Sequence, residues 1–163
     1  MDTMTHDKAN LTPKIALYEP DIPQNTASII RTCSCLGAQL EIIEPCGFLF
    51  TDKRFKRVVM DYMEKDMIKF FKSIDEFFKD KKNQRVILIT TKADMHYTKF
   101  KYKTNDTLLF GRESAGVPDA VHKTVNEKLK IPMKKNKRSL NLATSVGIVL
   151  AEQIRQIKKL NGN

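Results

Sequence analysis

Residues 131–156, IPMKKNKRSLNLATSVGIVLAEQIRQ, contain three successive patterns that indicate a short strand, a basic loop and a long helix. From Leu142 onward, apolar residues recur at the three- and four-residue spacing of an amphipathic helix. Ser139 and Asn141 are both plausible N-caps for this helix. A loop that leads into a helix N-terminus presents unpaired N–H groups, so we expect a ligand to bind here.

One face of the predicted helix carries only small residues. Ala143, Gly147 and Ala151 recur at every fourth position. A glycine inside a helix costs about 1 kcal/mol relative to alanine, so Gly147 needs a compensating role. Close approach of another backbone or of a ligand is the usual one. We therefore predict a packing surface along this face.

The composition is that of one soluble globular domain. Of 163 residues, 41% are hydrophobic and 29% are charged, and no apolar run reaches the roughly 20 residues of a membrane span. Residues 1–13 lack the apolar core of a signal peptide and are predicted to be a flexible lead-in to a single domain, residues 14–160. Three cysteines without a paired framework favour a reducing cytoplasm.

The net charge of +10 suits a polyanionic partner such as RNA or DNA. Lysine and arginine gather in four clusters: residues 53–57, 81–85, 99–103 and 134–138. A lysine-rich surface that only improves solubility is the alternative, and charge alone does not separate the two.

Strand and helix patterns alternate along the chain. Strands are predicted at residues 14–18, 39–43, 67–71, 85–90, 107–110 and 130–133. Helices are predicted between them, at residues 26–36, 52–60, from 73 onward, at 118–125 and from 142 onward. Local signals support the helix ends: Asn25 as an N-cap, Gly37 as a C′ residue, a capping box at Ser73 and Pro118 as a first helical residue. The alternation predicts an α/β domain with a mainly parallel sheet.

Ligands bind such sheets at the carboxyl ends of the strands. Three loops are expected there: residues 23–31, 111–116 and 131–142. In the first, Asn25 could act only as a helix cap and Arg31 only in a surface salt bridge. In the second, two glycines bracket Glu113, which favours a backbone that folds tightly around a ligand, although a plain strand-to-helix turn explains them too.

Two other kinds of site are not supported. Cys33, Cys35 and Cys46 lack the spacing of a zinc site. The histidines, at positions 6, 96 and 122, are scattered without the serine and carboxylate partners of a hydrolase triad. We predict no metal site.

Three segments together resemble the motifs of the SPOUT class of RNA methyltransferases. They are YEPDIPQNTASIIRTC at residues 18–33, LFGRESAGVP at 109–118 and IPMKKNKRSLNLATSVGIVLAEQ at 131–153. Within that class they are most similar to the tRNA 2′-O-methyltransferases that act on the wobble cytidine or uridine, position 34. The similarity extends over residues 15–156.

The resemblance implies a fold, a reaction and partners. The expected fold is a single-domain α/β knot, a mostly parallel sheet with helices on both faces and a C-terminal trefoil knot. The expected enzyme is a cytoplasmic homodimer, joined partly through its last helix, that transfers a methyl group from S-adenosyl-L-methionine to a ribose 2′-hydroxyl of tRNA. A SPOUT enzyme for another tRNA or rRNA site and a non-catalytic basic RNA-binding module are the alternatives.

The resemblance also assigns residues to roles. It implies a catalytic group of Arg31, Asn25 and Glu113, in which Arg31 orients a phosphate or lowers the hydroxyl pKa, because guanidinium is a poor base. Contacts to the cofactor are implied for Ile89, Gly111, Ile131, Met133, Ser139 and Leu140, with Gly111 leaving room for the cofactor. Contacts to the RNA are expected from Lys53, Arg54, Arg57, Lys137, Arg138 and Asn141.

Four positions depart from the family pattern. Ala27 stands where a glycine is common, and Arg112 stands where a proline is frequent. Ala115 replaces a larger residue, and Ala151 replaces a tyrosine found in many wobble-methylating relatives.

Overall fold

The computed structural model describes residues 12–60 and 67–160. Within these ranges, the side chains of Arg54, Val58, Met60, Lys159 and Leu160 are not described. The predicted lead-in, residues 1–13, therefore lies almost entirely outside the described part of the chain.

The described strands form one parallel sheet in the order β3-β2-β1-β6-β4-β7-β5. This confirms the predicted parallel sheet. The strands are β1 (Lys14–Tyr18), β2 (Gln39–Ile43), β3 (Ile68–Phe71), β4 (Val86–Ile89), β5 (Met95–His96), β6 (Thr107–Phe110) and β7 (Glu127–Lys130).

The last predicted strand was placed too late. β7 ends at Lys130, and residues 131–133 have already left the sheet. Pro132 cannot donate to a strand ladder, whereas Leu129 still accepts a 2.9 Å hydrogen bond from the backbone N–H of Thr90. The two-residue strand β5 was not predicted.

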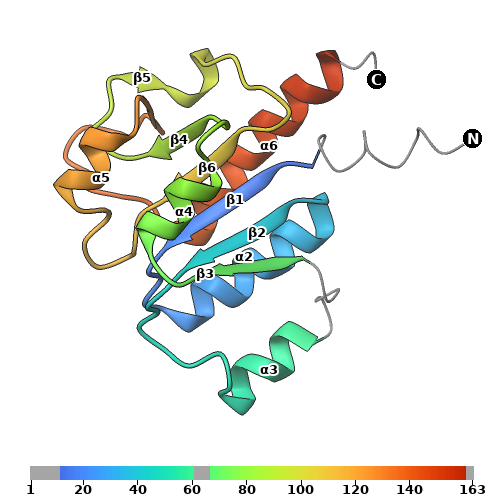
Figure 1. Cartoon of the computed structure of the whole chain (residues 1–163). Coiled ribbons are helices and arrows are strands. Elements are labelled where there is room, and N and C mark those ends of the chain that lie inside the picture. Colours follow the sequence, from blue (N-terminus) through green and yellow to red (C-terminus); the bar gives the residue numbers. More distant parts are fainter. Residues whose placement is uncertain (1–11, 61–66, 161–163) are drawn as a thin grey trace, which may run out of the picture.

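Helices cover both faces of the sheet, as predicted (Figure 1). One face carries α2 (Pro23–Leu36), α3 (Lys53–Met60) and α6 (Leu142–Leu160), and the other carries α4 (Ile74–Asp80) and α5 (Asp119–Thr124). A single 3-10 turn, η1 (Tyr97–Lys99), packs near α6. None of the described helices combines the length and apolarity needed to cross a membrane.

Three of the predicted helix ends are confirmed. Asn141 Oδ1 accepts a 3.2 Å hydrogen bond from the backbone N–H of Thr144, which makes Asn141 the cap of α6. Ser73 Oγ accepts from the N–H of Glu76 at 3.1 Å and caps α4. Gly37 ends α2 in the left-handed conformation, with φ 72°.

Two helix starts were predicted wrongly. α2 begins at Pro23 with Ile22 as its N-cap, so Asn25 lies inside the first turn instead of capping it. Proline favours this earlier start because its fixed φ suits the first helical position. Pro118 is the N-cap of α5, with ψ 155°, and Asp119 is the first helical residue.

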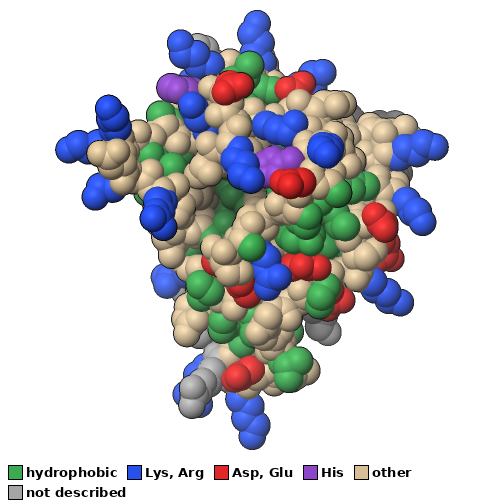
Figure 2. Space-filling model, turned by 90° about the vertical axis from the view of Figure 1, so that its left-hand side faces the viewer, with side chains coloured by type: hydrophobic (Ala, Val, Ile, Leu, Met, Phe, Trp, Pro, Cys, Tyr) green, Lys and Arg blue, Asp and Glu red, His purple; other side chains and the backbone are tan. Residues whose placement is uncertain are grey.

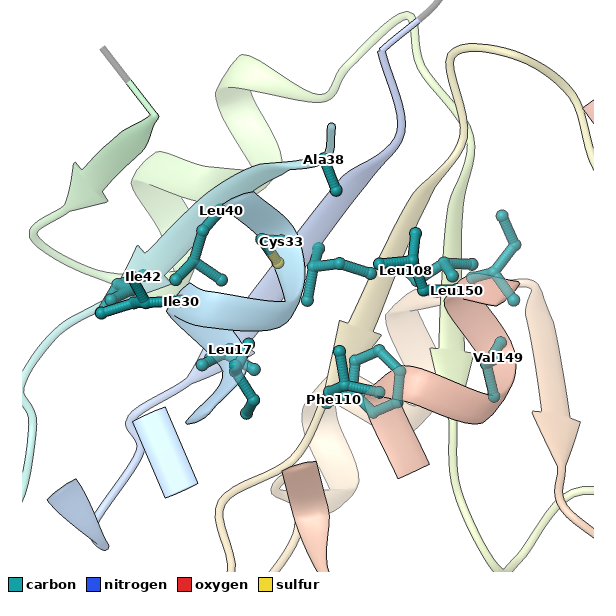
Figure 3. Packing of buried hydrophobic residues seen from close by; sticks show 14 of the residues in the cluster. Leu17, Ile30, Cys33, Ala38, Leu40, Ile42, Leu108, Phe110, Val149 and Leu150 are labelled. Carbon is teal, nitrogen blue, oxygen red and sulfur yellow. The ribbon is translucent and has the colours of Figure 1, made fainter. Parts of the chain in front are cut away.

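The larger core lies between the sheet and the α2–α6 layer. Figure 3 shows Leu17 and Leu40 of the sheet packed against Ile30 and Cys33 of α2, and Phe110 close to Val149 of α6. The predicted apolar stripe of α6 is confirmed at its centre, where Val146, Val149 and Leu150 are fully buried. Burial of one such side chain contributes about 1.5–3 kcal/mol.

The residues on the small face of α6 differ in their surroundings, because Ala143 is half-buried against the larger core. A Cβ atom added at Gly147 would meet no described atom within 4 Å, and Ala151 is exposed. A packing surface for a second copy stays a prediction, as does the trefoil knot, because strand order does not report how the chain threads.

Candidate functional site

A cavity of about 520 Å³ opens at the carboxyl ends of the central strands. Its walls come from the residues that follow β4, β6 and β7 and from the starts of α2 and α6. Figure 2 views this side of the molecule, toward which the strands of Figure 1 point, and shows Lys and Arg side chains projecting around it. The cavity lies where a parallel sheet is expected to bind ligands.

All six residues that the sequence assigned to the cofactor line this cavity: Ile89, Gly111, Ile131, Met133, Ser139 and Leu140. They come from three segments that lie far apart in the sequence. The mixture of apolar side chains with a few polar groups is typical of a small-molecule site. The structure thus brings these residues together, and their individual contacts with a cofactor stay predictions.

Gly111 is packed against the turn that follows it. A Cβ atom at this position would lie 2.6 Å from two backbone atoms of Gly116 and 3.0 Å from the backbone nitrogen of Val117. Arg112 and Gly116 close the turn with two backbone hydrogen bonds of 3.1 and 2.9 Å. The family resemblance implied a glycine here so that the cofactor could fit. The structure gives a second reason, since a side chain at this position would collide with the backbone of Gly116.

A chain of hydrogen bonds joins the three predicted loops at one wall of the cavity. Glu113 accepts from the backbone N–H of Asp21 at 2.9 Å and from Nδ2 of Asn25 at 3.4 Å. Asn25 Oδ1 in turn accepts from Asn141 Nδ2 at 3.0 Å. Because Asn141 also caps α6, the helix start and the two other loops are held as one unit.

The two carboxyl groups in this wall differ in proton affinity. Burial raises the pKa of Glu113, and the neighbouring Asp21 carboxylate raises it further. The Glu113 carboxyl, followed by Ser114 and Arg112, lowers the pKa of Asp21 to about 2. Asp21 is therefore ionised at neutral pH, and Glu113 is the member of the pair that holds a proton more readily.

The predicted catalytic group is only partly assembled. Asn25 and Glu113 line the cavity and contact each other. Arg31 is exposed on α2 and is not among the described residues that line the cavity. Arg31 follows Asn25 by six positions in the helix, which corresponds to about 9 Å along the axis.

The predicted RNA-binding residues fall into separate groups. Asn141 lines the cavity, and Lys137 and Arg138 are exposed in the loop between Met133 and Ser139. Lys53 and Arg57 are exposed on α3 and are not among the described residues of the cavity wall. The side chain of Arg54 lies outside the described part of the structure.

Several cavity residues were missed. Thr90, Thr91 and Lys92 follow β4 directly and line the cavity together with His122 of α5. The strand-end rule, applied to the loop after the predicted strand 85–90, could have found Thr91 and Lys92, whereas Thr90 was counted as part of that strand. The described residues contain no group of His, Cys, Asp or Glu side chains that could hold a metal ion.

Comparison with known proteins identifies the family. The SpoU rRNA Methylase family matches residues 13–151, which is most of the chain. The chain belongs to the SpoU methylase family.

Named relatives in the SpoU family are similar over nearly their whole length. The tRNA (cytidine(34)-2′-O)-methyltransferase of Beijerinckia indica is 43% identical over 148 residues, which cover 90% of this chain and 92% of that protein. The protein of the same name from Escherichia coli strain K12 is 38% identical over 145 residues, 88% of this chain and 92% of that protein.

A solved structure shares the same SpoU fold. It is described as giving structural insights into the 2-OH methylation of C/U34 on tRNA, and it matches with a TM-score of 0.86 and 34% identity. The match covers 92% of this chain and 99% of that one. The predicted SPOUT architecture, a mostly parallel α/β sheet covered by helices, is confirmed by this likeness.

Proposed function

We propose that this SpoU-family protein transfers a methyl group from S-adenosyl-L-methionine to the ribose 2′-hydroxyl of cytidine or uridine at position 34 of a tRNA. The observation that carries the proposal is that one cavity is lined both by all six predicted cofactor residues and by the hydrogen-bonded residues Asn25, Glu113 and Asn141. The names of the curated relatives supply the substrate and the position.

The cavity fits the proposed cofactor in size and in lining. Its volume of about 520 Å³ falls within the range of small-molecule sites. Ile89, Ile131 and Met133 would contact the adenosine part, and backbone groups near Ser139 and Leu140 would complete the wall. When bound, S-adenosyl-L-methionine supplies a methyl group that is already activated by its sulfonium.

The protein's own residues would orient the ribose and assist loss of its hydroxyl proton. Asn25 and Glu113 present an amide and a carboxyl at the cavity wall, where they can position a ribose hydroxyl by hydrogen bonds. Arg31 would orient a nucleotide phosphate or lower the pKa of the 2′-hydroxyl electrostatically.

Exposed cations near the cavity support a nucleic-acid substrate. Lys137 and Arg138 lie in a loop whose two ends line the cavity. They would contact tRNA phosphates beside the target nucleotide, and Lys53 and Arg57 would contact the RNA farther away. We further propose a cytoplasmic homodimer in which the small face of α6 packs against the second copy.

A methyl-transfer assay with position-specific substrates tests this function. Purified protein, S-adenosyl-L-methionine carrying a labelled methyl group and a tRNA with C34 or U34 should give a product that resists alkaline cleavage after residue 34. The matched control is the same tRNA with a single 2′-deoxynucleotide at position 34, which removes the acceptor and should abolish labelling.

Two outcomes would contradict the proposal. Equal labelling of the deoxy control would place the methyl group elsewhere. Labelling of ribosomal RNA with none of tRNA would favour the rRNA alternative that the family's description suggests.

A further inference from the structure

Arg112 lies between the cavity and the loop that joins β1 to α2. Its guanidinium is 3.4 Å from Asp21 Oδ2 and 3.7 Å from Glu19 Oε2. The side chains of Arg112, Glu19 and Asp21 are only 30%, 22% and 19% exposed. Water therefore screens this group of charges less than it screens a pair on the open surface.

Asp21 is held from two sides. Ser114 donates a short hydrogen bond to Asp21 Oδ2, and the backbone N–H of Asp21 donates to Glu113. On the other side, a Cβ atom added at Gly47 would lie 2.7 Å from Cβ of Asp21 and 2.9 Å from its Cα. Asp21 thus has little freedom to move away from Glu113.

One carboxylate oxygen in this cluster has no hydrogen-bond donor among the described residues. Asp21 Oδ1 is buried and accepts no hydrogen bond from a described protein donor. A buried acceptor without a partner is costly, and a proton on the neighbouring Glu113 carboxyl would satisfy it. The opposite changes in the pKa of the two groups agree with such a shared proton.

We propose that Arg112 is a positioning residue: its guanidinium holds the Asp21 carboxylate beside Glu113 and thereby fixes Glu113 and Asn25 for the ribose. The proposal rests on the methyl transfer proposed above. It adds a residue to which the family resemblance assigns no role, at a position where a proline is frequent and no cation would be available.

Other titratable groups lie around the Asp21–Glu113 pair. Tyr18 and Glu19 face it from the end of β1, and Glu44 and Cys46 face it from the loop after β2. Burial, followed by the negative charges of Glu44, Glu19 and Glu113, raises the pKa of the Cys46 thiol to about 12, so Cys46 stays neutral. The positive charge of Arg112 lowers the pKa of Asp21, in addition to the larger effects of Glu113 and Ser114.

The sign of the pH effect follows from this arrangement. Removal of the positive charge beside Asp21 makes its ionised form less favourable, so the pKa of Asp21 rises. The pair then gains protons at a higher pH. The acid limb of the rate profile should move in the same direction, because Glu113 loses its ionised partner.

The test compares Arg112→Gln with Arg112→Lys, and uses Lys69→Gln as the control. Lys69 of β3 forms a cation–carboxylate pair with Asp80 at 2.8 Å and is not among the described residues that line the cavity. Two measurements are made on each variant. Carboxyl-carbon NMR titration follows Asp21 and Glu113 without RNA, and single-turnover methyl transfer with saturating cofactor and tRNA is measured across pH.

Arg112→Gln should raise the titration midpoint of Asp21 by up to about one pH unit, because Arg112 is one of several groups that lower it. It should also slow methyl transfer by about tenfold, equivalent to about 1.4 kcal/mol, and move the acid limb to higher pH. Arg112→Lys keeps the charge, so its midpoint and rate should remain close to those of the unmodified protein. Lys69→Gln should change neither.

Several results would overturn the proposal. An unchanged Asp21 midpoint in Arg112→Gln would do so, as would a slower reaction with no shift of the midpoint or the acid limb, because that pattern means a purely structural role. If Arg112→Gln does not fold, Arg112→Lys decides, and a shifted midpoint there refutes the proposal. Failure of the unmodified protein to methylate tRNA would refute the proposed function alone, since the NMR titration needs no RNA.

Discussion

Substitution of Gly111 by alanine separates two explanations for a glycine at the edge of the cavity. The new Cβ would lie 2.6 Å from Gly116 Cα and C, whereas ordinary contacts of such an atom begin near 3.4 Å. The turn would have to move by most of an ångström, against the two hydrogen bonds that join Arg112 to Gly116. Overpacking of this kind costs about 1–3 kcal/mol.

The expected result is a loss of both stability and activity. For a domain of this size, that loss in the free energy of unfolding lowers Tm by about 2–12 °C. Because Gly116 and Glu113 also line the cavity, displacement of the turn should slow methyl transfer by about a hundredfold. Thermal unfolding, calorimetry with S-adenosyl-L-methionine and the single-turnover assay measure the three effects.

Lys79→Ala is the control, because Lys79 is exposed on α4 and is not among the described residues that line the cavity. It should leave Tm and methyl transfer nearly unchanged, since substitutions at such surface positions change stability by less than about 0.5 kcal/mol. A Gly111→Ala protein that keeps its Tm but no longer binds S-adenosyl-L-methionine would refute the explanation that Gly111 is required by its contact with Gly116. It would show that the methyl group collides with the cofactor and not with Gly116.

Three further predictions concern the buried charge, the second copy and the RNA. Lys81→Met should lower the free energy of unfolding by about 3–5 kcal/mol in urea denaturation, because it leaves Glu41, 1% exposed and 2.6 Å away, without its partner. Adding Glu41→Gln should recover part of that loss, and an equal loss in the double variant would argue against a coupled pair. Ala151→Arg should convert a dimer to a monomer in sedimentation analysis, and an unchanged dimer mass would exclude the small face of α6 from the interface. The double substitution Lys137→Ala and Arg138→Ala should reduce the salt slope of tRNA binding by about 1.5, and an unchanged slope would remove these residues from the RNA interface.

The strands that were easiest to predict are those with the simplest environment. Val86–Ile89 and Thr107–Phe110 are continuous runs that pack against helices on both faces, and such runs are distinctive. Glu127–Lys130 lies beside Val86–Ile89 in the sheet, yet its residues are charged except for Leu129, the one that is fully buried. Its position between β4 and β5 depends on tertiary pairing that the local pattern does not contain.

The walls of the site were predictable as segments but not as contacts. The strand-end rule identified the three loops, because it depends only on the order of strands and helices. The partners of Asp21 were not predictable. Glu113 and Ser114 lie 92 and 93 residues away in the sequence. A local sequence pattern does not show which residues of two distant loops come into contact.

Asn25 shows how an error in a helix boundary can hide a functional contact. A capping asparagine would direct its side-chain oxygen to its own helix. Because Pro23 starts α2 earlier, the Asn25 amide is left to donate to Glu113 and to accept from Asn141. Asn141 does act as a cap, and its oxygen and nitrogen serve different partners. The start of α6 is therefore part of the same hydrogen-bonded unit as the carboxyl pair. A displacement of any one of the three loops should consequently shift the position of the Glu113 side chain.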